Sequence, residues 1–167
     1  MKVFSNSSPL IYLSKIGRLE LLKNLFKEVI IPEEVYEEVV GKGRNERFLD
    51  ALKVESAVKE GWIKVKNRSY NRETENFGEI DEGESVLISI AKKERADLVL
   101  IDDASARIVA ESFGLNVKGT IYILLLGCKK KILDKEETKE LIKGLIEAGF
   151  KISAEIYAEV LDEMKRL

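Results

Sequence analysis

A short run of large aliphatic residues, Leu98 to Ile101, stops abruptly at two adjacent acids, Asp102 and Asp103. An apolar run of this length between polar stretches predicts a strand buried on both faces, as in parallel sheets. The two acids then lie at the carboxyl end of the strand, the edge where open α/β sheets bind their ligands. Adjacent carboxylates raise each other's pKa unless a positive charge joins them, and a divalent cation can supply that charge. The pair therefore predicts an α/β fold with a candidate metal site at one sheet edge.

Short apolar segments alternate with helical patterns along the rest of the chain. Strands alternating with helices indicate a parallel sheet with helical cover. We expect further strands at residues 2–4, 29–31, 62–65 and 116–118, and helices at 10–16, 19–26, 32–40, 45–60, 82–93, 104–113, 120–128, 134–148 and 153–166.

Three finer predictions concern the middle of the chain. The segment 41–43, which holds two glycines, is expected to break the helix that begins near Pro32. Residues 67–78 carry many charges and few apolar side chains, which is typical of an exposed loop. The buried side of the 45–60 helix is expected to consist of Phe48, Leu49, Leu52 and Val58.

Composition narrows the chemistry that the chain can perform. Histidine is absent, which removes the usual general base, the Ser-His-Asp triad and most zinc sites. Catalysis must therefore rest on carboxylates, Lys, Tyr, Ser or a hard metal ion. A single cysteine, Cys128, cannot form an intramolecular disulfide, so a reduced, cytoplasmic setting is the default expectation. Glutamine is absent and 35% of residues are charged, a composition that favours a thermophilic source.

Length and charge set further bounds. The 167 residues suffice for one domain with a substantial core. No apolar run is long enough to span a bilayer, and no secretory signal is expected at the start of the chain. The formal net charge of −2 argues against coating nucleic acid by bulk charge, but it leaves room for a local basic groove.

Other polar residues fall at positions that could join the acid pair. Each also has a structural interpretation: Asn6 as a helix N-cap, Glu38 as part of a solvated acidic face, Glu84 as a first-turn acid, and the Asp pair as a helix cap. Together, acids at several strand ends match the hard oxygen ligands of Mg²⁺ or Mn²⁺. The candidates are Asn6 after the first strand, Glu38, Glu84, Asp102 and Asp103.

The same residues resemble the motifs of the PIN-domain family. Residues 3–11 (VFSNSSPLI) are similar to the opening strand, polar residue and helix of that family, and residues 31–39 (IPEEVYEEV) resemble its second motif, where Glu38 matches the metal-binding Glu. Gly83-Glu84 and Ile101-Asp102-Asp103 resemble the third and fourth motifs. With Arg107, Gly114-Leu115 and Lys118-Gly119-Thr120, the pattern is similar to a prokaryotic PIN subgroup over about residues 1–130.

This resemblance implies a three-layer α/β/α sandwich and an Mg²⁺- or Mn²⁺-dependent endoribonuclease site. Glu38, Glu84 and Asp102 or Asp103 would be ligands, and Ser8 could orient an acid or a water. Many relatives are toxins of toxin–antitoxin pairs, which implies RNA as substrate, a small antitoxin as a possible partner, and a homodimer. We expect a PIN-like domain over 1–133 and a helical extension over 134–167 on the same domain. Leu141, Leu145, Ile156, Val160 and Leu161 would provide a dimer contact or cover the domain's own core.

One departure from the family pattern leaves an alternative open. The family's first acid is normally Asp, and an amide at Asn6 can ligate Mg²⁺ but brings no negative charge. The alternative is a catalytically weak or inactive PIN module that binds RNA or a protein partner. A phosphoryl-accepting receiver domain is a third hypothesis, but that fold needs an acid pair after its first strand, where this chain has only Asn6.

Several cations and aromatic residues could contact single-stranded or structured RNA. Arg107, one turn after Asp103, could meet a phosphate near the metal or pair with Asp103. The other candidates are Lys42, Arg44, Arg47, Lys64, Lys66, Arg68, Arg72 and Lys129–Lys131, with Tyr70 and Phe77 as stacking faces, although such charges can also be ordinary solvated surface.

Overall fold

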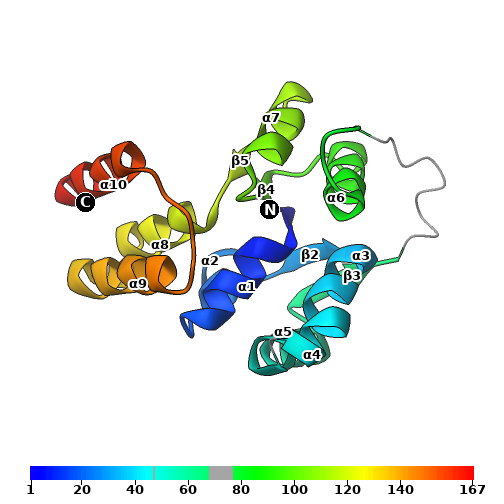
Figure 1. Ribbon diagram of the computed structural model, residues 1–167, viewed down its shortest axis with the longest axis horizontal. Helices are drawn as coiled ribbons and strands as arrows, with labels where there is room; N and C mark the ends of the chain where they lie inside the picture. Colours follow the sequence, from blue (N-terminus) through cyan, green and yellow to red (C-terminus); the bar gives the residue numbers. More distant parts are fainter. Residues whose placement is uncertain (47, 68–76) are drawn as a thin grey trace.

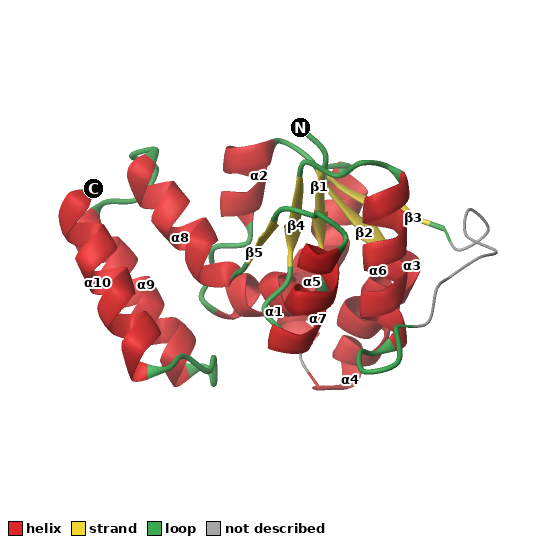
Figure 2. Ribbon diagram, turned by 90° about the horizontal axis from the view of Figure 1, so that it is seen from above, coloured by secondary structure: helices red, strands yellow, loops and turns green. Residues whose placement is uncertain are grey.

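A computed structural model describes residues 1–46, 48–67 and 77–167, and its centre is a five-stranded parallel sheet. The strand order is β3-β2-β1-β4-β5 (Figures 1 and 2). The strands are β1 (Val3–Ser5), β2 (Val29–Pro32), β3 (Ile63–Lys66), β4 (Leu98–Leu100) and β5 (Val117–Lys118). The predicted α/β fold with about five parallel strands is therefore confirmed, and the strand after Asp97 lies next to the central strand β1.

Side chains alternate between the two faces of the sheet. Phe4 lies in register with Ile30 on one side and Val99 on the other, and all three belong to one hydrophobic cluster. Val3 and Leu100 belong to the cluster on the opposite face. Both faces are therefore buried, which explains why the strands are short apolar runs without polar alternation.

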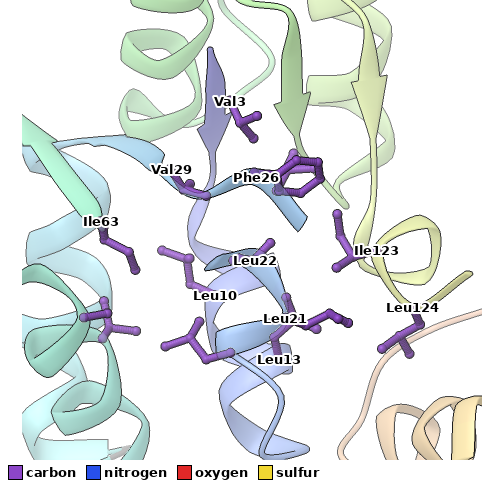
Figure 3. Packing of buried hydrophobic residues seen from close by; sticks show 14 of the residues in the cluster. Val3, Leu10, Leu13, Leu21, Leu22, Phe26, Val29, Ile63, Ile123 and Leu124 are labelled. Atoms are coloured by element: carbon purple, nitrogen blue, oxygen red, sulfur yellow. The ribbon is translucent and has the colours of Figure 1, made fainter. Parts of the chain in front are cut away.

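Helices cover both faces and complete the three-layer sandwich. The cluster around Phe4 is closed by α6 (Glu82–Lys93) and α7 (Ala104–Ser112). The opposite cluster is closed by α1 (Ser7–Lys15), α2 (Glu20–Phe26), α5 (Phe48–Glu60) and α8 (Thr120–Lys129). Leucines and isoleucines of α1, α2 and α8 lie in one cluster with Val3 and Val29 in Figure 3.

The segment after β2 corrects one prediction. The two glycines of residues 41–43 do not break the helix: α3 (Glu33–Tyr36) continues through the π-helical η1 (Glu37–Lys42) into α4 (Gly43–Glu46). Gly43 has helical dihedral angles, and a Cβ on Gly41 would lie 2.5 Å from Oε2 of Glu37. A side chain at position 41 would therefore require the end of the Glu37 side chain to move. Most of the predicted 67–78 loop lies outside the described residues.

The buried face of α5 differs from the prediction. Of the four residues expected on the buried side, Val58 packs against the core, but Phe48, Leu49 and Leu52 are exposed, at 58%, 71% and 42%. Ala51, Val54 and Ala57 are buried instead. The small side chains face α1, η1 and β3, where the backbones approach closely. The three larger apolar residues, Phe48, Leu49 and Leu52, which the helical pattern predicts to be buried, therefore point to solvent.

The chain ends in two helices, α9 (Lys135–Glu147) and α10 (Ala154–Arg166). They lie beside α8, beyond the β5 edge of the sheet (Figure 2). Leu145 and Val160 are buried in the same cluster as α1 and α2, so they cover the chain's own core and are not free for a dimer contact, whereas Ile156 is half exposed. The domain boundary near Leu133 stays a prediction. No helix in the described ranges is long and apolar enough to cross a bilayer.

Candidate functional site

Asn6 and Glu84 meet at the carboxyl edge of the sheet. The backbone N–H of Asn6 donates to the carbonyl oxygen of Leu100 over 2.9 Å, which aligns the ends of β1 and β4. Its side chain does not cap α1. Instead Nδ2 donates to Oε1 of Glu84 over 3.3 Å, and both residues are buried, at 6% and 7% exposure. Asn6 is therefore part of a polar site and not a helix cap.

Asp81 holds Glu84 in place from the start of α6. Oδ1 of Asp81 accepts from the N–H of Glu84 over 2.8 Å, and the N–H of Asp81 donates to Oε2 of Glu84 over 3.2 Å. This reciprocal capping box fixes the rotamer of Glu84 while it satisfies the first turn of the helix. The carboxylate of Glu84 thus has one oxygen on the Asp81 backbone and the other on Asn6.

The electrostatic environment of Glu84 is unfavourable for a free carboxylate. Burial, followed by the charge of Asp81 and then that of Asp103, raises the pKa of Glu84 to about 7. The hydrogen bonds from the Asp81 backbone and from Asn6 oppose this rise but do not cancel it. The site therefore has an excess of negative charge that a cation would relieve.

The two strand-end acids have different environments. Oδ1 of Asp103 caps α7 by accepting from the N–H of Ala106 over 2.9 Å, and the residue is exposed. Its charge is one cause of the raised pKa of Glu84, so the two carboxylates are close enough to interact. Asp103 is therefore accessible and acts on the same site as Glu84.

Asp102, in contrast, links β4 to the start of α8. Oδ1 accepts from the N–H of Thr120 and Oδ2 from its hydroxyl, each over 2.7 Å. Burial raises the pKa of Asp102, against the opposing effect of the Thr120 hydrogen bonds and of the Arg107 charge. A Cβ on Gly119 would lie 2.7 Å from Oδ1, so the glycine allows this close approach. Both oxygens of Asp102 are thus already engaged.

Glu38 reaches the same region from η1. Oε2 accepts from the hydroxyl of Ser7 over 2.6 Å, and a Cβ on Gly83 would lie 3.9 Å from that oxygen. The carboxylate therefore lies between the start of α1 and the start of α6. It lines a pocket of about 480 Å³ with Asp81 and Lys42. The contact to this acid comes from Ser7, one residue before the serine that was expected to orient an acid, Ser8.

Arg107 points back from α7 toward the strand end. Nη1 donates to the carbonyl oxygen of Ile101 over 3.4 Å, and within the described ranges Arg107 forms no ion pair with Asp103. Its charge acts on Asp102 instead. The guanidinium therefore lies on the Asp102 side of the strand end.

The predicted acids do not form a closed metal cluster. In the part of the chain that the structure describes, no three His, Cys, Asp or Glu side chains are placed to hold a metal ion together. Asn6, Glu84 and Asp103 form one group, Glu38 lies with Ser7 near α6, and Asp102 is bound to Thr120.

The residues predicted to contact RNA have varied positions. Lys66 pairs with Glu94 over 3.0 Å, and Arg44 pairs with Glu55 over 3.1 Å. The ring of Phe77 packs on that of Phe113 with centroids 5.0 Å apart. These three side chains therefore have intramolecular roles. Arg47, Arg68, Tyr70 and Arg72 lie outside the described residues.

Four residues at the site are not singled out as site residues by the sequence. An acid three positions before Glu84 is the signature of a capping box and could have identified Asp81. The other three have roles that depend on contacts across the fold, although two of them belong to the Lys118-Gly119-Thr120 motif of the family resemblance. They are Ser7, Gly119 and Thr120.

Comparison with known proteins agrees with this fold. A family model described as a PIN domain matches residues 2–166. A PilT N-terminus domain protein from the hyperthermophilic archaeon Sulfolobus solfataricus P2 has a similar fold, with a TM-score of 0.53 and 17% identity, over 74% of this chain and 90% of that one. No curated protein matches the chain. PIN domains generally have a nuclease fold, use divalent metals and commonly bind nucleic acid. Since the family model spans nearly all of its residues, this chain belongs to the PIN-domain family.

Proposed function

We propose that this chain is a divalent-metal-dependent endoribonuclease. The observation that carries the proposal is the buried contact between Asn6 and Glu84 at the carboxyl edge of β1 and β4, with the charges of Asp81 and Asp103 acting on Glu84. A buried carboxyl group with two acidic neighbours is expected where a cation completes the charge balance.

Glu84 and Asp103 are the proposed metal ligands, and the amide oxygen of Asn6 is a neutral third. Mg²⁺ and Mn²⁺ accept such oxygen ligands, and Mg²⁺ often takes only one or two carboxylates and completes its shell with water and phosphate. The side chains present therefore fit a hard divalent ion without a third carboxylate. Asp102 is assigned a structural role, because both its oxygens are bound to Thr120.

Chemistry at this site would follow from the metal and from the residues around it. A bound divalent ion supplies an activated water and neutralises charge on the phosphoryl group. The capping box with Asp81 keeps Glu84 in one orientation. Ser7 fixes Glu38, whose carboxylate could then orient a water by a hydrogen bond from the side of η1.

A PIN module that binds RNA or a protein without cutting is the second candidate. Two observations favour it: Asn6 takes the place of an acid, and no cluster of three acids is formed within the described ranges. A site with one carboxylate fewer is expected to bind metal more weakly. The two candidates share the fold and differ only in whether metal is held well enough for cleavage.

The assay is cleavage of single-stranded RNA with Mg²⁺ or Mn²⁺, comparing the wild type with Glu84→Gln and Asp103→Asn. Gln keeps the capping box and Asn keeps the α7 cap, so neither change removes the local fold. Metal-dependent cleavage that both variants lose supports the enzyme. No cleavage by the wild type, followed by cleavage with Asn6→Asp, supports the non-cutting module instead.

The toxin role, the antitoxin partner and the homodimer are finer proposals that rest on the family resemblance. Induced expression in a bacterial host, with Glu84→Gln as the matched control, tests the toxin role. Growth arrest by the wild type alone supports it, and normal growth at equal protein levels contradicts it. Light scattering of the purified chain measures the oligomeric mass.

A further inference from the structure

A groove next to Asp102 shares no lining residue with the pocket of Glu38, Asp81 and Lys42. It is a cavity of about 610 Å³ between α7 on one wall and the α9–α10 connection with the start of α10 on the other. The end of β5 and the start of α8 also line it, together with Asp102 and Gly119 between β4 and α8. The groove therefore begins at the strand edge that carries the proposed nuclease site.

The charge of this groove favours an anionic occupant. Arg107, Lys118 and Lys151 line it, and none of the three forms an ion pair with any residue that the structure describes. Two acids also line it, Asp102 and Glu111, so the three cations exceed the acids by one. These three cations along one groove make it locally basic in a chain whose net charge is −2.

Aromatic and apolar surface lies between these cations. Nζ of Lys118 lies 5.4 Å from the ring centroid of Tyr122. Phe150 also lines the groove, although its ring packs edge-on against that of Tyr12 with centroids 5.0 Å apart. Ile108 and Ile156, on α7 and α10, are 69% and 50% exposed. A groove that combines cations with aromatic and apolar side chains suits a single-stranded nucleic acid, whose phosphates meet the charges and whose bases stack or lie on apolar surface.

We propose that this groove binds the single-stranded RNA segment next to the phosphate at the metal site. The proposal rests on the proposed ribonuclease function and adds the path of the strand: from the Asn6–Glu84 site, past Arg107, to Lys118 and Lys151. The wall formed by α10 gives the C-terminal helices a role in substrate binding as well as in the core.

Binding is tested without metal, so that it is measured separately from cleavage. A fluorescently labelled 12-nucleotide RNA is titrated in EDTA with the wild type, with Lys118→Glu/Lys151→Glu, and with Lys135→Glu/Lys143→Glu on α9. The α9 pair makes the same change in net charge outside the groove. We expect the groove variant to weaken binding by about 10-fold or more and to lower the salt dependence by about two ion contacts, with the control within about 2-fold.

Equal weakening in the two double variants, or no weakening in either, overturns the proposal. So does a wild type that binds no RNA in EDTA. Cross-linking with 4-thiouridine RNA adds a readout that needs no substitution: adducts in the peptides with Tyr122 or Phe150 support the groove. Adducts found only in other peptides contradict it, and the exposed Ile108 and Ile156 would then be assigned to contact with a protein partner. Loss of cleavage with intact groove binding would instead reject the nuclease function alone.

Discussion

The side-chain amide of Asn6 donates to Oε1 of Glu84 over 3.3 Å, from the end of β1 to the first turn of α6. At this position an amide does two things that a carboxylate could not do in the absence of metal. It adds no charge beside Asp81 and Asp103, and it donates a hydrogen bond to a carboxyl group whose pKa is raised by burial and by those acids. Asn6 therefore stabilises the metal-free site, at the expense of one negatively charged ligand.

Asn6→Asp is expected to separate these two effects. In EDTA the new carboxylate lies against Glu84, so we expect a loss of about 1–3 kcal/mol in the free energy of unfolding. With Mn²⁺ the same change adds a charged ligand, so Mn²⁺ affinity is expected to rise by about 10-fold. Urea denaturation in both conditions and calorimetric titration of Mn²⁺ check these outcomes. A variant that is equally stable in EDTA and binds Mn²⁺ no better would contradict both assignments.

Metal-free stability is expected to decrease as the pH rises from about 4.5 to about 7. Glu84 titrates at about 7 in the folded chain, above its ordinary value of 4.5, so the native state holds more protons than the unfolded state across that interval. At about 1.4 kcal/mol per pKa unit, Glu84 accounts for at most about 3.5 kcal/mol of the total loss of stability over this interval. Urea denaturation against pH measures it, with Glu84→Gln as control. A Glu84→Gln variant with the full wild-type slope would show that the dependence has another origin.

Part of this site could be predicted from sequence, because a strand end is a local feature. The acid pair after residues 98–101 and Asn6 after the first strand are both predicted at one sheet edge, and both lie there. The sequence could not show which of Asp102 and Asp103 is available to bind metal, because the answer depends on the hydroxyl of Thr120. The choice of Ser7 over Ser8 likewise depends on the position of η1, a π-helix that no local pattern indicates.

Asp102→Asn is expected to lower stability, whereas Asp103→Asn is expected to lower Mn²⁺ affinity. Thr120 donates two hydrogen bonds, one to each carboxylate oxygen of Asp102. Asparagine at position 102 has only one side-chain oxygen, so its amide nitrogen would face one of these donors. We therefore expect a loss of about 1–3 kcal/mol in the free energy of unfolding. Asparagine at position 103 keeps the α7 cap, so we expect a change within about 0.5 kcal/mol and at least about a 10-fold loss of Mn²⁺ affinity. Denaturation and Mn²⁺ titration of both variants test this. The reverse profile would make Asp102 the ligand.

Gly119→Ala tests the close approach that holds Asp102. The new Cβ would lie 2.7 Å from Oδ1 of Asp102 and 3.1 Å from Nη1 of Arg107, so we expect a loss of about 1–3 kcal/mol. Gly144→Ala in α9 is the matched control, because its Cβ would find nothing closer than 3.5 Å and helix propensity favours alanine by about 0.5–1 kcal/mol. Thermal denaturation of both variants measures the difference. Equal stability of the two would show that the loop at Gly119 shifts freely.

The sequence predicts the strands of this fold better than it predicts which side chains of α5 are buried. Strands buried on both faces are apolar throughout, so Leu98 to Ile101 could be read from composition alone. The face of α5 could not, because its buried residues are small and its exposed ones are large. Close approach of backbones selects Ala51 and Ala57, and no sequence pattern records how close neighbouring helices lie.

Substitutions on the two faces of α5 are expected to show which side is inside. Leu49 is 71% exposed, so Leu49→Lys should change the free energy of unfolding by no more than about 0.5 kcal/mol. Val54 is fully buried against the central core, so Val54→Ala should cost about 1–3 kcal/mol through lost packing and the space left behind. Urea denaturation followed by circular dichroism compares the two variants. A greater loss for Leu49→Lys than for Val54→Ala would mean that the large apolar face is covered in solution, by a second copy of the chain or by another protein, and dilution would then lower the apparent stability.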